Sequence, residues 1–302
     1  MHISIYHHIL INYSDCMKIQ TLTILLCLGF TICLGQTFVK KQTVIPLNNS
    51  NGVPYYIDPD LNDYGIKGFD VDSKGDFYFF AGLRTGCLAV FSGITQKYRQ
   101  CYANFPANEL YVYKDSLYTF FKNDSGVNRL IKLNAENGLP QKNYNHLTSK
   151  YIDGYKFADG SLILGYYDNT EDSLKEKFAQ YALNGKFMKR APGEFNVPAT
   201  LAPEQGPKAI CDYVGRWKGN YVYWSVPMSK LGIEKLYLVD KTGKVLASGI
   251  LPRGFSGDGF ADNPGEDRKV RNDSFYVLGR KGKLAVITEV PLADLFATSS
   301  PQ

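Results

Sequence analysis

Hydrophobic and polar positions along this chain recur as one pattern: an apolar strand, a polar turn of one or two residues, and a second strand denser in aromatic residues. Such alternation over short segments is typical of antiparallel β-hairpins. The pattern predicts five hairpins, at Gly68–Gly82, Leu110–Lys122, Tyr151–Tyr167, Ala209–Val226 and Lys269–Arg280. Their turn centres lie 40 to 60 residues apart, near Gly75, Asp115, Asp159, Gly219 and Asp273.

A further strand pair follows most of these hairpins, with turn residues such as Asn184-Gly185 between its strands. Four strands repeating about every 40 to 50 residues are typical of a β-propeller blade. Several second strands, such as Phe77–Phe80 and Tyr221–Trp224, are apolar on both faces, as a strand packed between two neighbouring sheets requires. We therefore expect an all-β propeller of five blades. The alternative is six blades, with a degenerate sixth blade in Tyr55–Tyr64 or Ala191–Lys208.

The ends of the chain predict how the ring closes. The last hairpin is followed by the strand Lys283–Val290 but by no fourth strand, and Thr37–Leu47 is a strand without a hairpin. If Thr37–Leu47 completes the last blade, no exposed sheet edge remains there. Asn169–Gln180 is the one stretch with helical spacing, and we interpret it as a loop insertion.

The segment Gly68–Phe79 (GFDVDSKGDFYF) resembles the repeat of NHL and SMP-30/gluconolactonase-like propellers, and Phe157–Ile163 is a weaker copy. The resemblance implies a propeller, six-bladed in that family. It also implies a divalent metal held by Glu, Asn and Asp at the central channel of the lactonase-like members. Those ligands have no assignable counterparts in this chain.

The amino-terminal residues predict export. Met17-Lys18 and the apolar run Ile19–Leu34 have the layout of a signal peptide that ends at Gly35, and the run is short for a membrane span. We expect residues 1–16 to be a mis-start or an extension of the leader, 17–35 a signal peptide, and 36–302 one propeller domain. The mature protein would be periplasmic, secreted or on the cell surface, without a stable membrane span.

The net charge and the number of histidines disfavour several classes of function. The net charge of +5 comes from 34 basic and 29 acidic residues without a basic run, which disfavours nucleic acid as a partner. After removal of residues 1–35, His146 is the single histidine. Catalytic triads and multi-histidine zinc sites are therefore disfavoured.

Asp258, Asp262 and Glu266 lie in a loop with Gly and Pro and offer the hard oxygen ligands that calcium prefers. Their spacing matches no EF-hand, and Asp58–Asp63 is an equally good candidate. Calcium is thus a candidate cofactor. The alternative is that these are solvated loop acids.

Tyr213, Arg216 and Trp217 form a candidate ligand-binding group, because amphipathic rings beside a cation suit a glycan or peptide. Core packing is the alternative for Trp217, and we favour it for Tyr223 and Trp224.

If their strands pair across Ser92–Gln96, Cys87 and Cys101 are directly opposite each other. In an exported protein the two thiols could then be oxidised to a disulfide. Two independent buried thiols are the alternative. Cys211 is expected to be a buried, unpaired thiol.

These observations favour an exported propeller that binds a small molecule, a glycan or a protein partner near its central channel without catalysis. The rival hypothesis is a calcium-dependent hydrolase or lactonase, in which the ion polarises a carbonyl group. A structural component of a cell-surface assembly is a third possibility.

Overall fold

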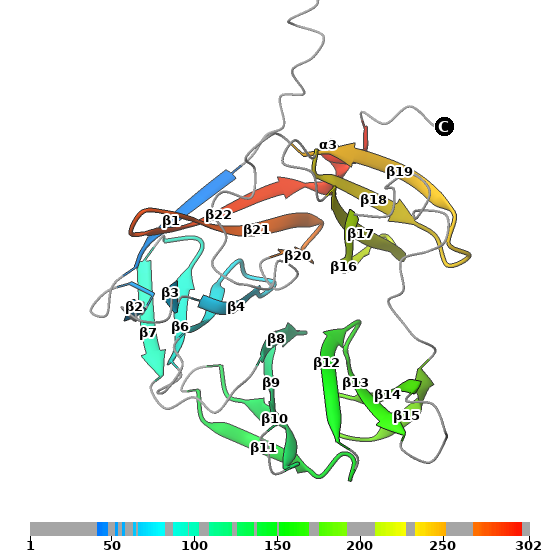
Figure 1. Ribbon diagram of the computed structural model, residues 1–302. Coiled ribbons are helices and arrows are strands. Elements are labelled where there is room, and N and C mark those ends of the chain that lie inside the picture. Colours follow the sequence, from blue (N-terminus) through cyan, green and yellow to red (C-terminus); the bar gives the residue numbers. More distant parts are fainter. Residues whose placement is uncertain are drawn as a thin grey trace, which may run out of the picture. The chain divides into compact units, whose positions relative to one another are not determined.

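The chain forms five antiparallel sheets of four strands each, arranged as the blades of a β-propeller in the computed structural model (Figure 1). All the described residues lie in the compact unit Lys40–Gln302. The structure describes residues 41–47, 52–53, 56–57, 63–64, 66–81, 87–95, 97–102, 109–122, 126–135, 138–149, 151–168, 175–191, 209–227, 233–251 and 268–297.

The blades are numbered in chain order, and each strand list runs from the centre of the propeller outward. Blade 1 consists of β4 (Ile66–Val71), β5 (Phe77–Ala81), β6 (Cys87–Ser92) and β7 (Lys97–Tyr102). Blade 2 consists of β8 (Glu109–Tyr113), β9 (Ser116–Lys122), β10 (Asn128–Leu133) and β11 (Pro140–Asn145). Blade 3 consists of β12 (Ile152–Ala158), β13 (Ser161–Asp168), β14 (Lys175–Ala182) and β15 (Phe187–Ala191). Blade 4 consists of β16 (Ala209–Trp217), β17 (Asn220–Pro227), β18 (Lys235–Val239) and β19 (Val245–Ile250). Blade 5 consists of β20 (Arg268–Arg271), β21 (Ser274–Lys281), β22 (Leu284–Pro291) and β1 (Lys41–Pro46).

Blade 5 joins the two ends of the described chain and confirms the predicted closure. Strand β1 pairs antiparallel with β22, with Lys41 opposite Glu289 and Pro46 opposite Leu284. In Figure 1 the blue β1 lies along the red β22. The amino-terminal strand therefore supplies the outermost strand of the last blade and covers an edge of β22 that would otherwise be unpaired.

Tight turns join the first two strands of the blades, at the predicted positions. In four blades the turn contains non-glycine residues with positive φ, for example 48° and 55° at Lys114 and Asp115 and 47° and 61° at Asn272 and Asp273. Two consecutive positive φ values are the signature of the type I′ turn, whose twist matches that of the flanking strands. The polar turn residues in the sequence are thus the direct cause of these hairpins.

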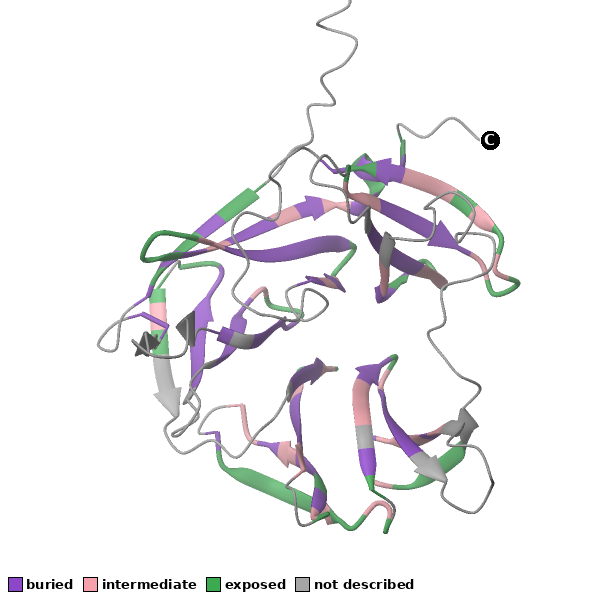
Figure 2. Cartoon of the chain, viewed as in Figure 1, coloured by how far each residue is buried: buried purple, intermediate pink, exposed green. Residues whose placement is uncertain are grey.

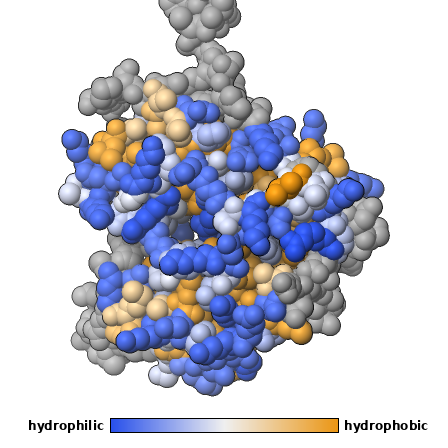
Figure 3. Space-filling model, turned by 180° about the vertical axis from the view of Figure 1, so that it is seen from behind, coloured by the Kyte–Doolittle hydropathy of each residue, from blue (hydrophilic) through white to orange (hydrophobic). Residues whose placement is uncertain are grey.

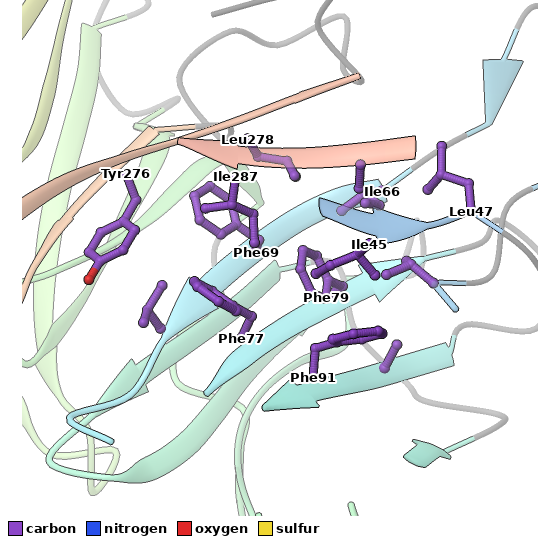
Figure 4. Close-up of a cluster of buried hydrophobic side chains, with 14 residues drawn as sticks. Ile45, Leu47, Ile66, Phe69, Phe77, Phe79, Phe91, Tyr276, Leu278 and Ile287 are labelled. Atoms are coloured by element: carbon purple, nitrogen blue, oxygen red, sulfur yellow. The ribbon is translucent and has the colours of Figure 1, made fainter. Parts of the chain in front are cut away.

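Strands that are apolar on both faces fill two blade interfaces at once, as their sequence predicts. On β5, Phe77 and Phe79 are buried in a cluster with residues of blade 5, whereas Tyr78 and Phe80 are buried against blade 2. Figure 4 shows the first of these clusters, in which Ile45 of β1 lies among the aromatic side chains. Figure 2 shows that burial is greatest in the inner strands, while the outermost strand of blade 2, β11, is largely exposed.

Blades 4 and 5 meet through close backbone approach and a short helix, α3 (Leu292–Ala297). A Cβ at Gly215 of β16 would lie 2.7 Å from Cβ of Val270 on β20, so only glycine fits between these strands. Phe296 of α3 packs against Trp217, with ring centroids 5.5 Å apart. The helix was missed at the sequence level because six residues are too few to display helical periodicity.

The structure corrects or completes several expectations from the sequence. Residues 175–180, which have helical spacing, belong to strand β14, and the described residues form five blades, whereas the family resemblance implies six. Of the second stretch named for a further blade, residues 192–208 lie outside the described residues. Tyr56–Ile57 and Asp63–Tyr64 form a two-stranded ribbon, β2 and β3, instead of a further blade. Among the residues described, no helix is long and apolar enough to traverse a bilayer.

Candidate functional site

A cavity of about 610 Å³ lies where the innermost strands of all five blades meet. It is lined by residues of β4, β8, β12, β16 and β20 and of the turns that follow four of them. Its volume is in the range of small-molecule sites. Because every blade contributes, the cavity exists only when the ring is complete.

A fully buried carboxylate holds three blades together beside this cavity. Asp70 of blade 1 accepts a hydrogen bond from the Val112 amide of blade 2 at 2.8 Å, and its Oδ2 pairs with Nη2 of Arg271 of blade 5 at 2.9 Å. Arg271 also donates from Nη1 to the Val270 carbonyl. The guanidinium group, which lines the cavity, is thereby fixed in orientation.

A second carboxylate, Asp159, organises the opposite wall. It lies in the turn after β12 and accepts the Tyr213 hydroxyl at 2.7 Å, while its other oxygen pairs with Nε of Arg216 at 2.8 Å. Burial, with the negative charge of Asp159 as the next cause, raises the pKa of Tyr213, so this hydroxyl stays protonated. Nζ of Lys156 donates to the Tyr213 carbonyl at 2.9 Å.

Tyr111 of β8 connects these two groups. Its ring stacks on Phe157 with centroids 4.9 Å apart, and its hydroxyl accepts a hydrogen bond from the Gly160 amide at 3.0 Å. The guanidinium carbon of Arg271 lies 5.1 Å from the centroid of the Tyr111 ring. Burial raises the pKa of Tyr111 to about 12, so the phenol is neutral at physiological pH.

Gly160 is required at its position for two reasons. Its φ is +74°, which side chains of L-residues rarely adopt. A Cβ there would also lie 2.4 Å from Cζ of Tyr113. The turn that carries Asp159 can therefore pack closely against blade 2.

Of the predicted ligand-binding group, Tyr213 and Arg216 line the cavity together. Trp217 does not: it is buried against Phe296, and its Nε1 has no hydrogen-bond partner among the described residues. Trp224 and Tyr223 are core residues as favoured, and the Trp224 indole donates to Glu234 at 2.8 Å. His146 is exposed at the end of β11, remote in the fold from the inner strands that line the cavity.

The three acids named as calcium ligands, Asp258, Asp262 and Glu266, lie outside the described residues. Within the described ranges, no group of three or more His, Cys, Asp or Glu side chains is placed to hold a metal ion. The calcium hypothesis stays a prediction.

The paired strands β6 and β7 place Cys101 opposite Ala89, not opposite Cys87. The expected direct opposition was therefore wrong. The turn places Ser92, not Phe91, opposite Lys97, and a register shift between Val90 and Phe91 displaces the pairing by one further residue. The side chains of Cys87 and Cys101 lie outside the described part, so the disulfide stays a prediction. Cys211 is half-buried on β16 and forms no disulfide with any residue that the structure describes.

Sequence reasoning missed Lys156 and Arg271 as cavity residues and Asp70 as the buried partner of Arg271, and it treated Asp159 only as a turn residue. A signal was present, because each of these four residues lies within two residues of the carboxyl end of the first strand of a predicted hairpin. In a propeller these strand ends gather around the central axis, so charged residues there deserve priority over charged residues in outer loops.

No protein-family model and no curated protein matches this chain. Among solved structures, the Dos1 propeller is 14% identical over 75% of this chain and 56% of that chain, with a TM-score of 0.33. An oligogalacturonate lyase in complex with manganese is 10% identical over 83% of this chain and 90% of that chain, also with a TM-score of 0.33. The chain thus spans just over half the length of the Dos1 propeller structure, and neither likeness bears on activity.

Proposed function

We propose that this protein is a binding protein whose central cavity receives a small molecule or a small part of a larger partner. The observation that carries the proposal is the cavity of about 610 Å³, to which all five blades contribute polar or charged side chains. A site built on rigid strands of several elements is held more accurately than one built on a single loop.

The polar groups of the cavity support binding in preference to proton transfer. Tyr213 and Arg216 are both held by Asp159, so their orientation is set before any ligand arrives. The raised pKa of Tyr213 keeps its hydroxyl a donor throughout the physiological range. Groups that are oriented in advance lose little entropy when a ligand binds.

The proposal includes export from the cytoplasm. It is supported by the sequence of residues 17–35 alone, which lie outside the described part of the chain. An amino-terminal sequence determination on protein recovered from the native source tests it, with Gln36 as the expected first residue.

The test of binding uses a variant that fills the cavity. Gly154 lines it, and a Cβ added there meets no atom within 4 Å, so Gly154→Leu should occupy ligand space without a clash at Cβ. Asn143→Leu, on the exposed strand β11, is the control for an added leucine. Sugars, amino acids, dipeptides and organic acids are screened by thermal shift, and the compounds that bind are then titrated calorimetrically.

We expect Gly154→Leu to weaken binding by a factor of at least about 10, or about 1.4 kcal/mol, and Asn143→Leu to leave it unchanged. Equal affinity in the two variants would contradict a central site. The rival hydrolase is tested in the same samples: conversion of the ligand to a product, together with a melting temperature raised by calcium and lowered by a chelator, would replace the binding proposal. If Gly154→Leu fails to fold, Lys156→Glu, also in the lining, takes its place.

A further inference from the structure

Most acidic side chains of the cavity are already engaged by donors of the protein itself. Six basic and four acidic residues line it. Asp72 accepts the amides of Lys74 and Asp76, at 3.0 and 2.8 Å, within its own turn. Asp159 is held by Tyr213 and Arg216 as described, Asp115 accepts the Ser73 amide, and Asp212 is half-buried on β16.

Some basic side chains of the lining have fewer ion pairs and hydrogen bonds to balance their charge. Lys269, half-buried on β20, makes no ion pair with any residue in the described ranges, and Lys114 contacts the face of the Tyr113 ring, 5.4 Å from its centroid. Arg271 pairs with Asp70, but its buried Nε has no hydrogen-bond partner within the described structure. The lining therefore has positive charge to spare.

A neutral hydrogen-bond donor lies beside this charge. The Tyr111 hydroxyl uses a lone pair to accept the Gly160 amide, and its own hydrogen has no acceptor among the described residues. The Arg271 guanidinium group lies against the same ring. A protonated hydroxyl next to cations is the arrangement that receives an anionic oxygen, because bonds between such donors and ionised acceptors are the stronger ones.

Building on the proposed function, we propose that the ligand of the central cavity is a small organic acid, whose carboxylate is received by the Tyr111 hydroxyl in the positive field of Arg271 and Lys269. The cavity is large enough for a body of about the size of a hexose beside the carboxylate. Tyr213 and Arg216 would then face the uncharged part of the ligand on the opposite wall.

The experiment is calorimetric titration of the full chain at low ionic strength with three probes: D-glucuronate, D-glucose and inorganic phosphate. Glucuronate and glucose share a ring and differ chiefly in the carboxylate. We expect glucuronate to bind at least about 10-fold more tightly than glucose and to weaken as sodium chloride is added.

Two variants locate the carboxylate. Lys269→Gln and Tyr111→Phe should each weaken glucuronate binding by a factor of about 3 to 10, the range expected for one charged or neutral hydrogen-bonding group. Lys281→Gln removes the same charge from blade 5 at an exposed position outside the cavity, and binding should not change.

The outcomes are distinguishable. Glucose binding as tightly as glucuronate, phosphate binding more tightly than glucuronate, or equal losses in Lys269→Gln and Lys281→Gln would each overturn the carboxylate assignment. Absence of glucuronate binding up to about 10 mM would overturn it as well. In these cases the proposed function still stands if another compound binds the wild type and is lost in Gly154→Leu. It fails separately if ligands bind Gly154→Leu normally.

Discussion

At the scale of single residues, the buried ion pair between Asp70 and Arg271 is a contact whose loss should strongly lower the stability of the protein. Removing one partner leaves a buried charge without compensation, which costs more than the pair itself contributes. We expect Asp70→Asn to lower the free energy of unfolding by about 3 to 5 kcal/mol in urea titrations. Asp273→Asn, which changes an exposed turn acid of blade 5, should change it by less than about 0.5 kcal/mol. Similar effects of the two variants would show that the buried pair has no special role.

The glycines of two blade turns offer a second comparison between residues. Gly75 and Gly160 both have positive φ, 80° and 74°, but a Cβ meets nothing within 4 Å at Gly75 and collides with the Tyr113 ring at Gly160. Gly75→Ala should therefore cost only the backbone strain, about 1 to 2 kcal/mol. Gly160→Ala should cost more, and its cavity should bind ligands less well because Tyr113 has to move. Equal thermal stabilities of the two variants would rule out the steric contribution.

At the scale of elements, strand β1 decides whether blade 5 is complete. Ile45 is fully buried among the side chains of blades 1 and 5, whereas its neighbour Val44 is 48% exposed. We expect Ile45→Ala to destabilise the protein by about 2 to 4 kcal/mol, the usual range for truncating a buried aliphatic side chain. Val44→Ala should cost less than about 1 kcal/mol. Chemical denaturation measures both, and a small effect of Ile45→Ala would mean that β1 contributes little to closure.

Most elements were predictable because their local chemistry and their packing agree. Asn272-Asp273 and Asp159-Gly160 have the residues that type I′ turns need, and the alternate faces of Phe77–Phe80 meet two different blades. Helix α3 and the β6–β7 register were not predictable, because a six-residue helix has no measurable period and the sequence pattern does not show where a β-bulge displaces the pairing of two strands.

The site was less predictable than the fold. Tyr213 and Arg216 were identified because they are conspicuous beside two tryptophans. The same reasoning added Trp217, which does not line the cavity and packs against Phe296, nearly eighty residues away in the sequence. Asp70 and Arg271 are 201 positions apart, so their pairing follows only from the closed ring. Local pattern fixes which strands form, but it does not indicate which strand ends converge.

At the scale of the whole molecule, buried tyrosines make stability depend on alkaline pH. Among the described residues, eight tyrosines have a raised pKa, chiefly through burial; for Tyr111 and Tyr223 the value is about 12. Their ordinary value is 10.0, so above that pH the unfolded chain releases protons that the folded protein keeps. The stabilisation is complete below pH 10 and is lost as the pH rises toward the folded-state pKa, by up to about 1.4 kcal/mol per pH unit for each group.

Urea titrations at a series of pH values from neutral to strongly alkaline measure this loss. We expect Tyr111→Phe to make the decline above pH 10 less steep than in the wild type, since one titrating group is removed. Only the slopes are compared, because the substitution also removes the hydrogen bond from the Gly160 amide. A slope identical to that of the wild type would mean that Tyr111 ionises equally in both states.

The surface offers a different kind of evidence at this scale. On the face drawn in Figure 3, hydrophilic side chains predominate and apolar groups are scattered among them. The large exposed apolar residues of the described chain do not line the cavity, and two of them, Phe187 and Met188, lie on the outer strand β15.

The pairing of β1 with β22 has a consequence for biosynthesis. The residues of β1 leave the ribosome before those of blades 1 to 4, and the residues of β22 leave it after them, so a nascent chain can build these four blades while β1 has no partner strand. The pairing that completes blade 5 can form only after β22 has been synthesised. Until translation reaches Pro291, β1 needs either shelter from a chaperone or rapid folding to escape aggregation.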